Sequence, residues 1–175
     1  MKARHSVCQY KNQPIGTESV LKLQSEIDLC NKESGLHIQL VTNEPKAFDG
    51  FMAHYGKFSG VTNYIALIGE KSSLLDEKCG YFGERLVLKA QEQGLNTCWV
   101  AMTHGKSQAK IKKGQKLLIL ISLGYGDTQG VAHRSKSIKE LSHADEETEW
   151  FTKGMEAVCL APTAMNQQKF LFELK

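Results

Sequence analysis

The residues best suited to chemistry of their own are five cysteines and six histidines, and neither type is spaced for it. The cysteines are an odd number, widely separated, with no Cys-x-x-Cys pair. This distribution favours reduced thiols in a cytoplasm over a disulfide framework or a zinc site. No cysteine has a histidine at a diagnostic spacing, so the sequence predicts neither a thiol nucleophile nor a metal site. The cysteine positions are Cys8, Cys30, Cys79, Cys98 and Cys159.

Two further patterns give little support to a nucleotide or nucleic-acid site. Gly124-Tyr125-Gly126 follows a predicted strand, but the glycines are not spaced as Gly-x-Gly-x-x-Gly and no helix is predicted after them. The lysines from Lys106 to Lys116 have no interleaved aromatic residues, which is typical of a solvated turn. The net charge of +3 is too small to indicate a nucleic-acid partner.

Four other segments combine basic, hydroxyl, amide and aromatic side chains. Residues 4–10 read Arg-His-Ser-Val-Cys-Gln-Tyr, residues 94–100 read Gly-Leu-Asn-Thr-Cys-Trp-Val, and residues 133–136 read His-Arg-Ser-Lys. Residues 161–168 read Ala-Pro-Thr-Ala-Met-Asn-Gln-Gln. Each segment alone is typical of surface or core packing, so any functional meaning lies in their combination and order.

In this order the segments resemble the nitroreductase family of flavoproteins. That family opens with Arg-x-Ser-x-Arg-x-aromatic, has a long helix followed by Gly-Leu-Gly/Asn-x-Cys-Trp, and has a basic loop after a Leu/Ile-rich strand. Residues 161–168 resemble its Ala-Pro-Ser-x-x-Asn-x-Gln turn, which in most members lies near the N-terminus. Its place near the C-terminus here resembles a less common branch. The resemblance extends from Arg4 to Leu174.

The resemblance implies an FMN-dependent NAD(P)H oxidoreductase. Such an enzyme takes a hydride from NADH or NADPH and passes electrons to a nitroaromatic, quinone or flavin-like acceptor. Flavin N5 does the chemistry, so no catalytic residue is expected. The alternative is a non-catalytic flavin-binding protein of the same fold. The family also implies a homodimer whose partner is a small-molecule electron acceptor. The small net charge and the lack of a long apolar run predict no nucleic-acid or membrane partner, and the cysteine distribution predicts a cytoplasmic location.

The same resemblance implies a set of FMN contacts. Arg4, Arg134 and Lys136 are expected to bind the FMN phosphate. His5 and Ser6 are expected to contact the phosphate or the ribityl chain. Backbone N–H groups after Trp99 are expected to donate to flavin N5. The 162–167 turn is expected at the ring or its pyrimidine edge. The full set is Arg4, His5, Ser6, Cys8, Trp99, Ala101, Met102, Arg134, Lys136, Pro162, Asn166 and Gln167.

Two departures from the family pattern stand out. Cys8 occupies a position where the family usually has a cation near flavin N1 and O2, and a thiol cannot supply that charge. The related branch also continues beyond the strand predicted at residues 170–174. Whether the chain is truncated or of natural length therefore stays open.

Hydrophobic periodicity predicts the elements that must position these residues. Hydrophobic residues make up 41% of the chain and charged residues 23%. This composition and the chain length predict a single globular domain that spans residues 1–175. No signal peptide is visible, and the longest apolar run, residues 117–121, is far shorter than a membrane span.

Strands are predicted at residues 36–40, 64–68, 97–102, 116–123 and 170–174. Helices are predicted from Thr17 to Gly35, from Asn43 to Tyr55, from Leu75 to Gln93, and from Asp145 to Pro162, and residues 124–143 are predicted as a long loop.

Two of the helices have an apolar face that is expected to point inward. That face comprises Phe48, Phe51, Met52 and Tyr55 in the second helix, and Trp150, Phe151, Met155, Val158 and Cys159 in the last. The alternation of helices and strands predicts an α/β or α+β fold with a helix-covered sheet. The family resemblance narrows this to an α+β, three-layer α/β/α sandwich with a mixed, mainly antiparallel central sheet.

Overall fold

The computed structural model describes residues 1–144 and 148–174, and the chain forms two compact units. The larger unit comprises Arg4–Gly130, and the smaller unit comprises Met1–Ala3 with Val131–Lys175. Each unit has its own hydrophobic core. The two are described separately below, and the assignment of residues 1–175 to one domain stays a prediction.

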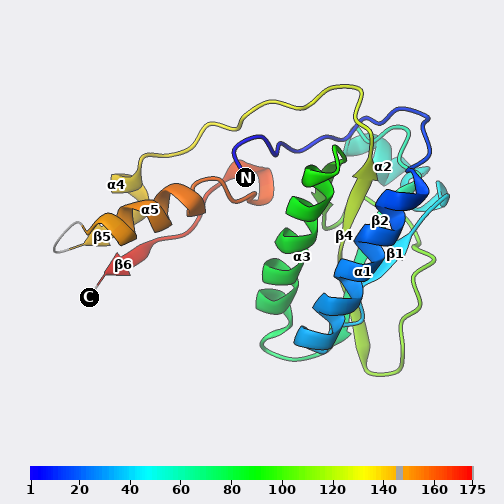
Figure 1. The fold of residues 1–175 in the computed structure, drawn as a ribbon, viewed down its shortest axis with the longest axis horizontal. Helices are drawn as coiled ribbons and strands as arrows, with labels where there is room; N and C mark the ends of the chain where they lie inside the picture. The colour runs from blue at the N-terminus through cyan, green and yellow to red at the C-terminus, as the bar shows by residue number, and fades with distance from the viewer. Residues whose placement is uncertain (145–147, 175) are drawn as a thin grey trace. The chain divides into compact units, whose positions relative to one another are not determined.

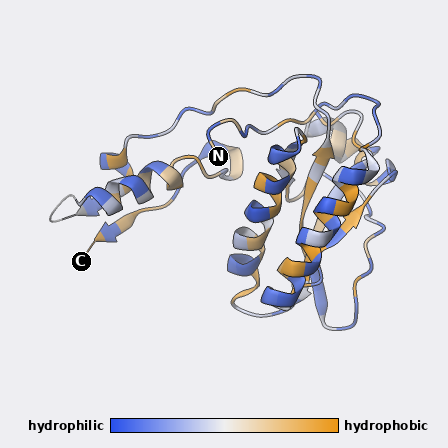
Figure 2. Ribbon diagram, in the orientation of Figure 1, coloured by the Kyte–Doolittle hydropathy of each residue, from blue (hydrophilic) through white to orange (hydrophobic). Residues whose placement is uncertain are grey.

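The larger unit is built on a four-stranded antiparallel sheet (Figure 1). Its strand order is β1-β2-β4-β3, so β2 and β4 lie in the middle. All of β2 pairs with β4, with a register shift between Leu67 and Ile68. Every β2 residue except the last is buried, which agrees with a central strand covered on both faces. In Figure 2 these strands are mostly orange, the colour of hydrophobic residues. The strands are β1 (Gln39–Val41), β2 (Asn63–Glu70), β3 (Asn96–Val100) and β4 (Gln115–Gly124).

Two long helices, α1 (Thr17–Ser34) and α3 (Leu75–Glu92), lie on one face of this sheet (Figure 1). Their apolar stripes form one core cluster with residues of β2 and β4. The predicted helix bounds are close to the observed ones, although Thr17 is the first helical residue and Gly16 occupies the N-cap. Gly35 ends α1 with φ 72°, a left-handed conformation that glycine adopts without steric cost.

The other face is covered by shorter elements, η1 (Lys46–Phe48) and α2 (Phe51–Tyr55). The sequence predicted one helix here, beginning near Asn43, and that prediction is wrong. Asn43 has φ 55°, and the Glu44 carboxylate accepts hydrogen bonds from the backbone at residues 46 and 47, which starts a separate 3-10 turn. The break alters the inward face, so Phe48 is buried whereas Phe51 and Tyr55 are 83% and 77% exposed.

The smaller unit has a small core formed by Leu141, Phe151, Met155 and Cys159. The prediction that Trp150 points inward is wrong, because Trp150 is 65% exposed. Successive helical residues point about 100° apart, so Trp150 and Phe151 cannot both lie at the centre of the buried face. The elements are α4 (Ile138–Leu141), β5 (Ser142–Ala144), α5 (Glu149–Val158), η2 (Ala164–Asn166) and β6 (Phe172–Leu174), with β5 and β6 parallel.

The long loop predicted at residues 124–143 is shorter than expected. Its last part forms α4 and β5, and Ser137 and Glu140 make a reciprocal capping box at the start of α4. Ser137-x-x-Glu140 is the sequence signature of such a box. The predicted start of the last helix, Asp145, lies outside the described residues.

The observed elements confirm an α+β fold with a mainly antiparallel sheet. A parallel bridge between Ser6 and Thr97 places the N-terminal segment beside β3, so pairing is mixed at that edge. No helix in the described part of the chain is both long enough and apolar enough to cross a membrane.

Candidate functional site

The N-terminal segment, residues 4–10, is held in the larger unit by backbone pairing. Val7 N donates to Thr97 O at 3.1 Å, near the start of β3, and Ser59 N donates to Cys8 O at 3.1 Å. The buried Tyr10 hydroxyl donates to Val7 O at 2.6 Å and lies 2.8 Å from the hydroxyl oxygen of Ser122. Burial raises the pKa of Tyr10 well above its usual value. The sequence-predicted residues of this segment therefore have fixed positions beside β3.

Arg4 and Trp99, both predicted contacts, are brought together by Glu84 of α3. Arg4 Nε lies 3.8 Å from Glu84 Oε1, and Trp99 Nε1 donates to Glu84 Oε2 at 3.2 Å. Burial raises the pKa of Glu84, while the Arg4 charge and the Trp99 hydrogen bond partly oppose the rise. Sequence reasoning missed Glu84, because a single glutamate in a surface helix carries no distinguishing signal.

The approach of Trp99 to α3 requires a glycine at position 83. A Cβ atom built on Gly83 would lie 2.3 Å from Trp99 Cη2 and 2.7 Å from Leu67 Cδ1, which is closer than real atoms approach. Gly83 is buried within α3, where glycine costs helix stability. Space for the indole ring explains why the helix carries a glycine there, and this packing places Trp99 Nε1 at Glu84.

Arg4 itself is in an unusual environment. It is only 5% exposed, and its Nη1 atom is buried with no hydrogen-bond partner among the described residues. Buried polar groups are nearly always paired, and a buried cation has a large desolvation cost. Glu84, at 3.8 Å from Nε, does not satisfy Nη1. Arg4 therefore has a buried guanidinium N–H for which the described residues provide no acceptor.

The neighbours of Arg4 in the segment differ in exposure. His5 is half-buried, with Nδ1 at 3.3 Å from Gln129 O, and Ser6 is exposed. Cys8 is half-buried, and its sulfur lies 3.6 Å from that of Cys98. The structure therefore places a thiol pair at the position where the family pattern has a cation.

Two further predicted residues, Ala101 and Met102, were expected inside the strand that contains Trp99. That expectation is wrong, because β3 ends at Val100. Both residues are exposed, Met102 by 79%. Their backbone groups are free of the β3–β4 ladder, which runs from Asn96 to Val100 on β3.

The smaller unit brings together the other predicted contacts. Asn166 Nδ2 donates to Arg134 O at 2.9 Å, and Lys136 N donates to Gln168 Oε1 at 2.7 Å. The side chains of Arg134 and Lys136 are exposed. The predicted Gln167 is exposed as well. Its neighbour Gln168 is 2% exposed, and its buried Nε2 has no hydrogen-bond partner among the described residues.

Gln168 is the second residue that sequence reasoning missed. The signal was present, because Gln168 is the last residue of the Ala-Pro-x-x-x-Asn-x-Gln pattern that begins at Ala161. The turn that carries it is strained, with φ of 52° at Met165, 54° at Asn166 and 47° at Gln168. Non-glycine residues in this region cost about 1–2 kcal/mol each and often occur at functional sites. Half-buried Pro162 precedes this turn.

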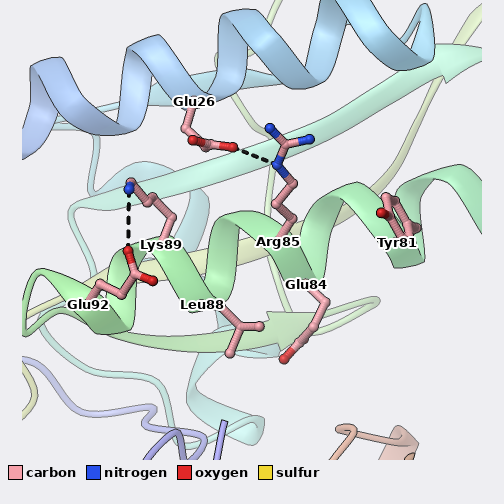
Figure 3. A pocket seen from close by; sticks show the side chains of 7 residues that line it. All are labelled: Glu26, Tyr81, Glu84, Arg85, Leu88, Lys89 and Glu92. Carbon is pink, nitrogen blue, oxygen red and sulfur yellow. Dashed lines mark hydrogen bonds and ion pairs between the residues drawn. The ribbon is translucent and has the colours of Figure 1, made fainter. Parts of the chain in front are cut away.

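A surface pocket of about 490 Å³ lies along α3 in the larger unit (Figure 3). Figure 3 shows ion pairs from Glu26 to Arg85 and from Lys89 to Glu92 inside it. Its three carboxylates outnumber its two cations, so the pocket does not suit a phosphate. None of the predicted FMN contacts lines it, although Glu84, which does, also contacts Arg4 and Trp99. Its lining is Glu26, Tyr81, Glu84, Arg85, Leu88, Lys89 and Glu92.

Within residues 1–144 and 148–174, no group of three or more histidine, cysteine or acidic side chains is placed to hold a metal ion. The candidate groups in the larger unit are therefore the Arg4–Glu84–Trp99 cluster and the nearby thiol pair. Those in the smaller unit are the exposed cations and the strained turn.

Comparison with known proteins decides the family. The family described as "Putative TM nitroreductase" matches residues 1–175, the whole chain. The chain belongs to this nitroreductase family. No curated protein sequence matches it.

Solved structures with the nitroreductase fold agree with this assignment. A "putative nitroreductase" from Thermotoga maritima MSB8 is 22% identical with a TM-score of 0.65, over 99% of this chain and 69% of that one. An FMN-dependent nitroreductase from Clostridium difficile R20291 is 19% identical with a TM-score of 0.59, and the match covers 76% of this chain and 89% of that chain. A nitroreductase with bound FMN from Bacteroides fragilis NCTC 9343 is 19% identical with a TM-score of 0.55, and the match covers 78% of this chain and 90% of that chain. The nitroreductase fold inferred from sequence is thus confirmed.

Proposed function

We propose that this nitroreductase-family chain is an FMN-dependent oxidoreductase that uses NADH or NADPH as its electron donor. The electrons would pass to a small nitroaromatic, quinone or flavin-like acceptor. The observation that carries the proposal is Arg4, a buried cation in the segment that resembles the family's phosphate contact, with an N–H that no residue in the described part of the chain accepts from. FMN-bound structures of the same fold support the choice of cofactor.

The residues of the larger unit fit an FMN phosphate. A phosphate dianion needs a fixed cation and hydrogen-bond donors. Arg4 would supply the cation, and the exposed Ser6 hydroxyl and the half-buried His5 ring would supply donors. Arg4 is already held near Glu84, so little side-chain entropy would be lost when it binds an anion.

FMN, when bound, supplies the electron transfer between nicotinamide and acceptor. The protein's own work is then to bind, orient and shield. Trp99 is held by Gly83 packing and by its hydrogen bond to Glu84, and it would offer a fixed aromatic surface. The exposed backbone after β3, at Ala101 and Met102, would supply N–H donors. This division of labour needs no acid–base pair from the protein.

The smaller unit is proposed to contribute FMN contacts of its own. Arg134 is anchored through its backbone oxygen to Asn166, and Lys136 is anchored to Gln168 through its backbone N–H and through its ammonium group, whose Nζ lies 3.5 Å from Gln168 O. That anchoring leaves the guanidinium of Arg134 exposed to solvent and able to bind an anion. The buried Nε2 of Gln168, which has no partner within residues 1–144 and 148–174, would be a further donor. Homodimer formation and a cytoplasmic location also stay proposals.

The test is steady-state consumption of NADH and NADPH by the purified chain, with and without added FMN, in the presence of a quinone or nitroaromatic acceptor. We expect consumption that requires FMN and acceptor together. Tight FMN binding without consumption would favour the alternative, a non-catalytic flavin-binding protein. Failure to bind FMN would overturn the proposal.

A further inference from the structure

Two cysteines that are far apart in the sequence lie side by side in the larger unit. Cys8 Sγ and Cys98 Sγ are 3.6 Å apart, although the residues are 90 positions apart in the chain. The backbone around them is fixed, because Ser59 N donates to Cys8 O and Val7 N donates to Thr97 O, each at 3.1 Å. A disulfide bond is about 2.05 Å long, so the sulfur atoms must approach by about 1.5 Å. Side-chain rotation can supply movement of this size.

The two thiols are chemically unequal. A hydrogen bond between the thiols lowers the pKa of Cys8 and raises that of Cys98, and burial raises the pKa of Cys98 further. The hydroxyl of Ser6 and the charge of Arg4 act in the opposite direction on Cys98, with smaller effects. Cys8 is also half-buried and so within reach of a small oxidant. Redox-sensing sites share this arrangement of an accessible, more acidic thiol beside a resolving thiol.

The other three cysteines lack this arrangement. Cys30, Cys79 and Cys159 are all buried, and no hydrogen bond from any of them to another cysteine occurs in the described part of the chain. Burial raises the pKa of each, to about 11 for Cys79. A thiol that is neutral and shielded reacts slowly with oxidants.

We propose that Cys8 and Cys98 are a redox pair that a hydroperoxide converts into a reversible intrachain disulfide. The Cys8 thiolate attacks one peroxide oxygen, the O–O bond breaks, and the departing hydroxide takes a proton to become water. Cys98 sulfur then attacks Cys8 sulfur, the S–O bond breaks, and the hydroxyl leaves as water with the Cys98 proton. Two thiols lose two electrons in total, and hydrogen peroxide is reduced to two waters.

The test treats the reduced full-length chain with hydrogen peroxide, blocks the remaining thiols with an alkylating reagent, and maps the peptides by mass spectrometry. Free thiols should fall from five to three per chain, and one linked peptide pair should contain Cys8 and Cys98. Dithiothreitol should restore all five thiols. The chain should remain a single unlinked species on a non-reducing gel, because the bond lies within one chain.

Variants separate the pair from the other thiols. Cys79→Ala is the matched control, because this substitution removes a buried thiol outside the pair. Peroxide should still convert two thiols of this variant into the Cys8–Cys98 disulfide. Cys8→Ser and Cys98→Ala should form no intrachain disulfide. The proposal is overturned if the parent map shows Cys98 still free while Cys8 stops at the sulfinic acid. It is also overturned if either cysteine is linked to a different one. These readings on the parent chain do not depend on whether the variants fold or on FMN binding.

Discussion

Replacing Arg4 tests the proposed phosphate contact most sharply. Arg4 is 5% exposed, its Nη1 has no hydrogen-bond partner among the residues that the structure describes, and Glu84 lies 3.8 Å from its Nε. A hydrogen bond to a charged group contributes about 1.5–3 kcal/mol. At about 1.4 kcal/mol for each factor of ten, Arg4→Ala should weaken FMN binding by roughly ten- to a hundredfold. Riboflavin, which lacks the phosphate, should bind the variant and the parent with similar affinity.

The assay is quenching of flavin fluorescence during titration with protein, performed with FMN and with riboflavin. Arg85→Ala is the matched control, because Arg85 also lies in the larger unit but pairs with Glu26 and Glu33 on the helix surface. This variant should keep the parent affinity for both flavins.

Arg4→Ala also leaves the Glu84 carboxylate without its nearest cation, so the variant should be less stable as well. The double variant Arg4→Ala with Glu84→Gln removes that unpaired charge and should recover stability without recovering FMN affinity. Unchanged FMN affinity in Arg4→Ala would refute the reasoning. An equal loss of FMN and riboflavin would assign Arg4 a purely structural role.

Further predictions concern the smaller unit, a buried hydroxyl and a buried carboxylate. Arg134→Ala and Lys136→Ala should each weaken FMN binding by roughly tenfold or more and leave riboflavin binding unchanged, as measured by the same titration. Tyr10→Phe removes two buried hydrogen bonds and should lower the free energy of unfolding in urea by about 1–3 kcal/mol, whereas Tyr81→Phe, at an exposed site, should change it by less than about 0.5 kcal/mol. The pKa of Glu84 is raised in the folded chain, so the folded state binds the Glu84 proton more tightly than the unfolded state does. The free energy of unfolding of the parent should therefore fall as the pH rises just above the usual carboxyl pKa of about 4.3. Urea midpoints between about pH 4 and pH 7 should therefore fall for the parent relative to Glu84→Gln, and parallel curves would contradict the assignment.

Long periodic segments made most of the larger unit predictable from sequence. The stripe of Leu23, Ile27 and Cys30 indicated a helix packed on one side, and all three are buried. The 43–55 region could not be predicted in the same way, because a continuous apolar stripe assumes one continuous helix. The break near Glu44 depends on its side chain bonding to nearby backbone, and helix periodicity does not report such bonds.

Site residues that belong to a sequence motif could be predicted. Contacts between residues that are distant in the sequence could not. Arg4 and Trp99 came from the family pattern, and their connection through Glu84 depends on how α3 packs against β3. The contact between Cys8 and Cys98 joins segments 90 residues apart, so no local pattern could indicate it.

The central claim is that this chain binds FMN and reduces it with a nicotinamide, and anaerobic titration tests it most directly. The FMN-bound protein, free of oxygen, is titrated with NADH and separately with NADPH while the flavin and nicotinamide absorbance bands are recorded. The proposed function predicts that the flavin band bleaches with at least one donor, with one nicotinamide oxidised for each flavin reduced. A flavin band that stays unchanged at excess of both donors would contradict it.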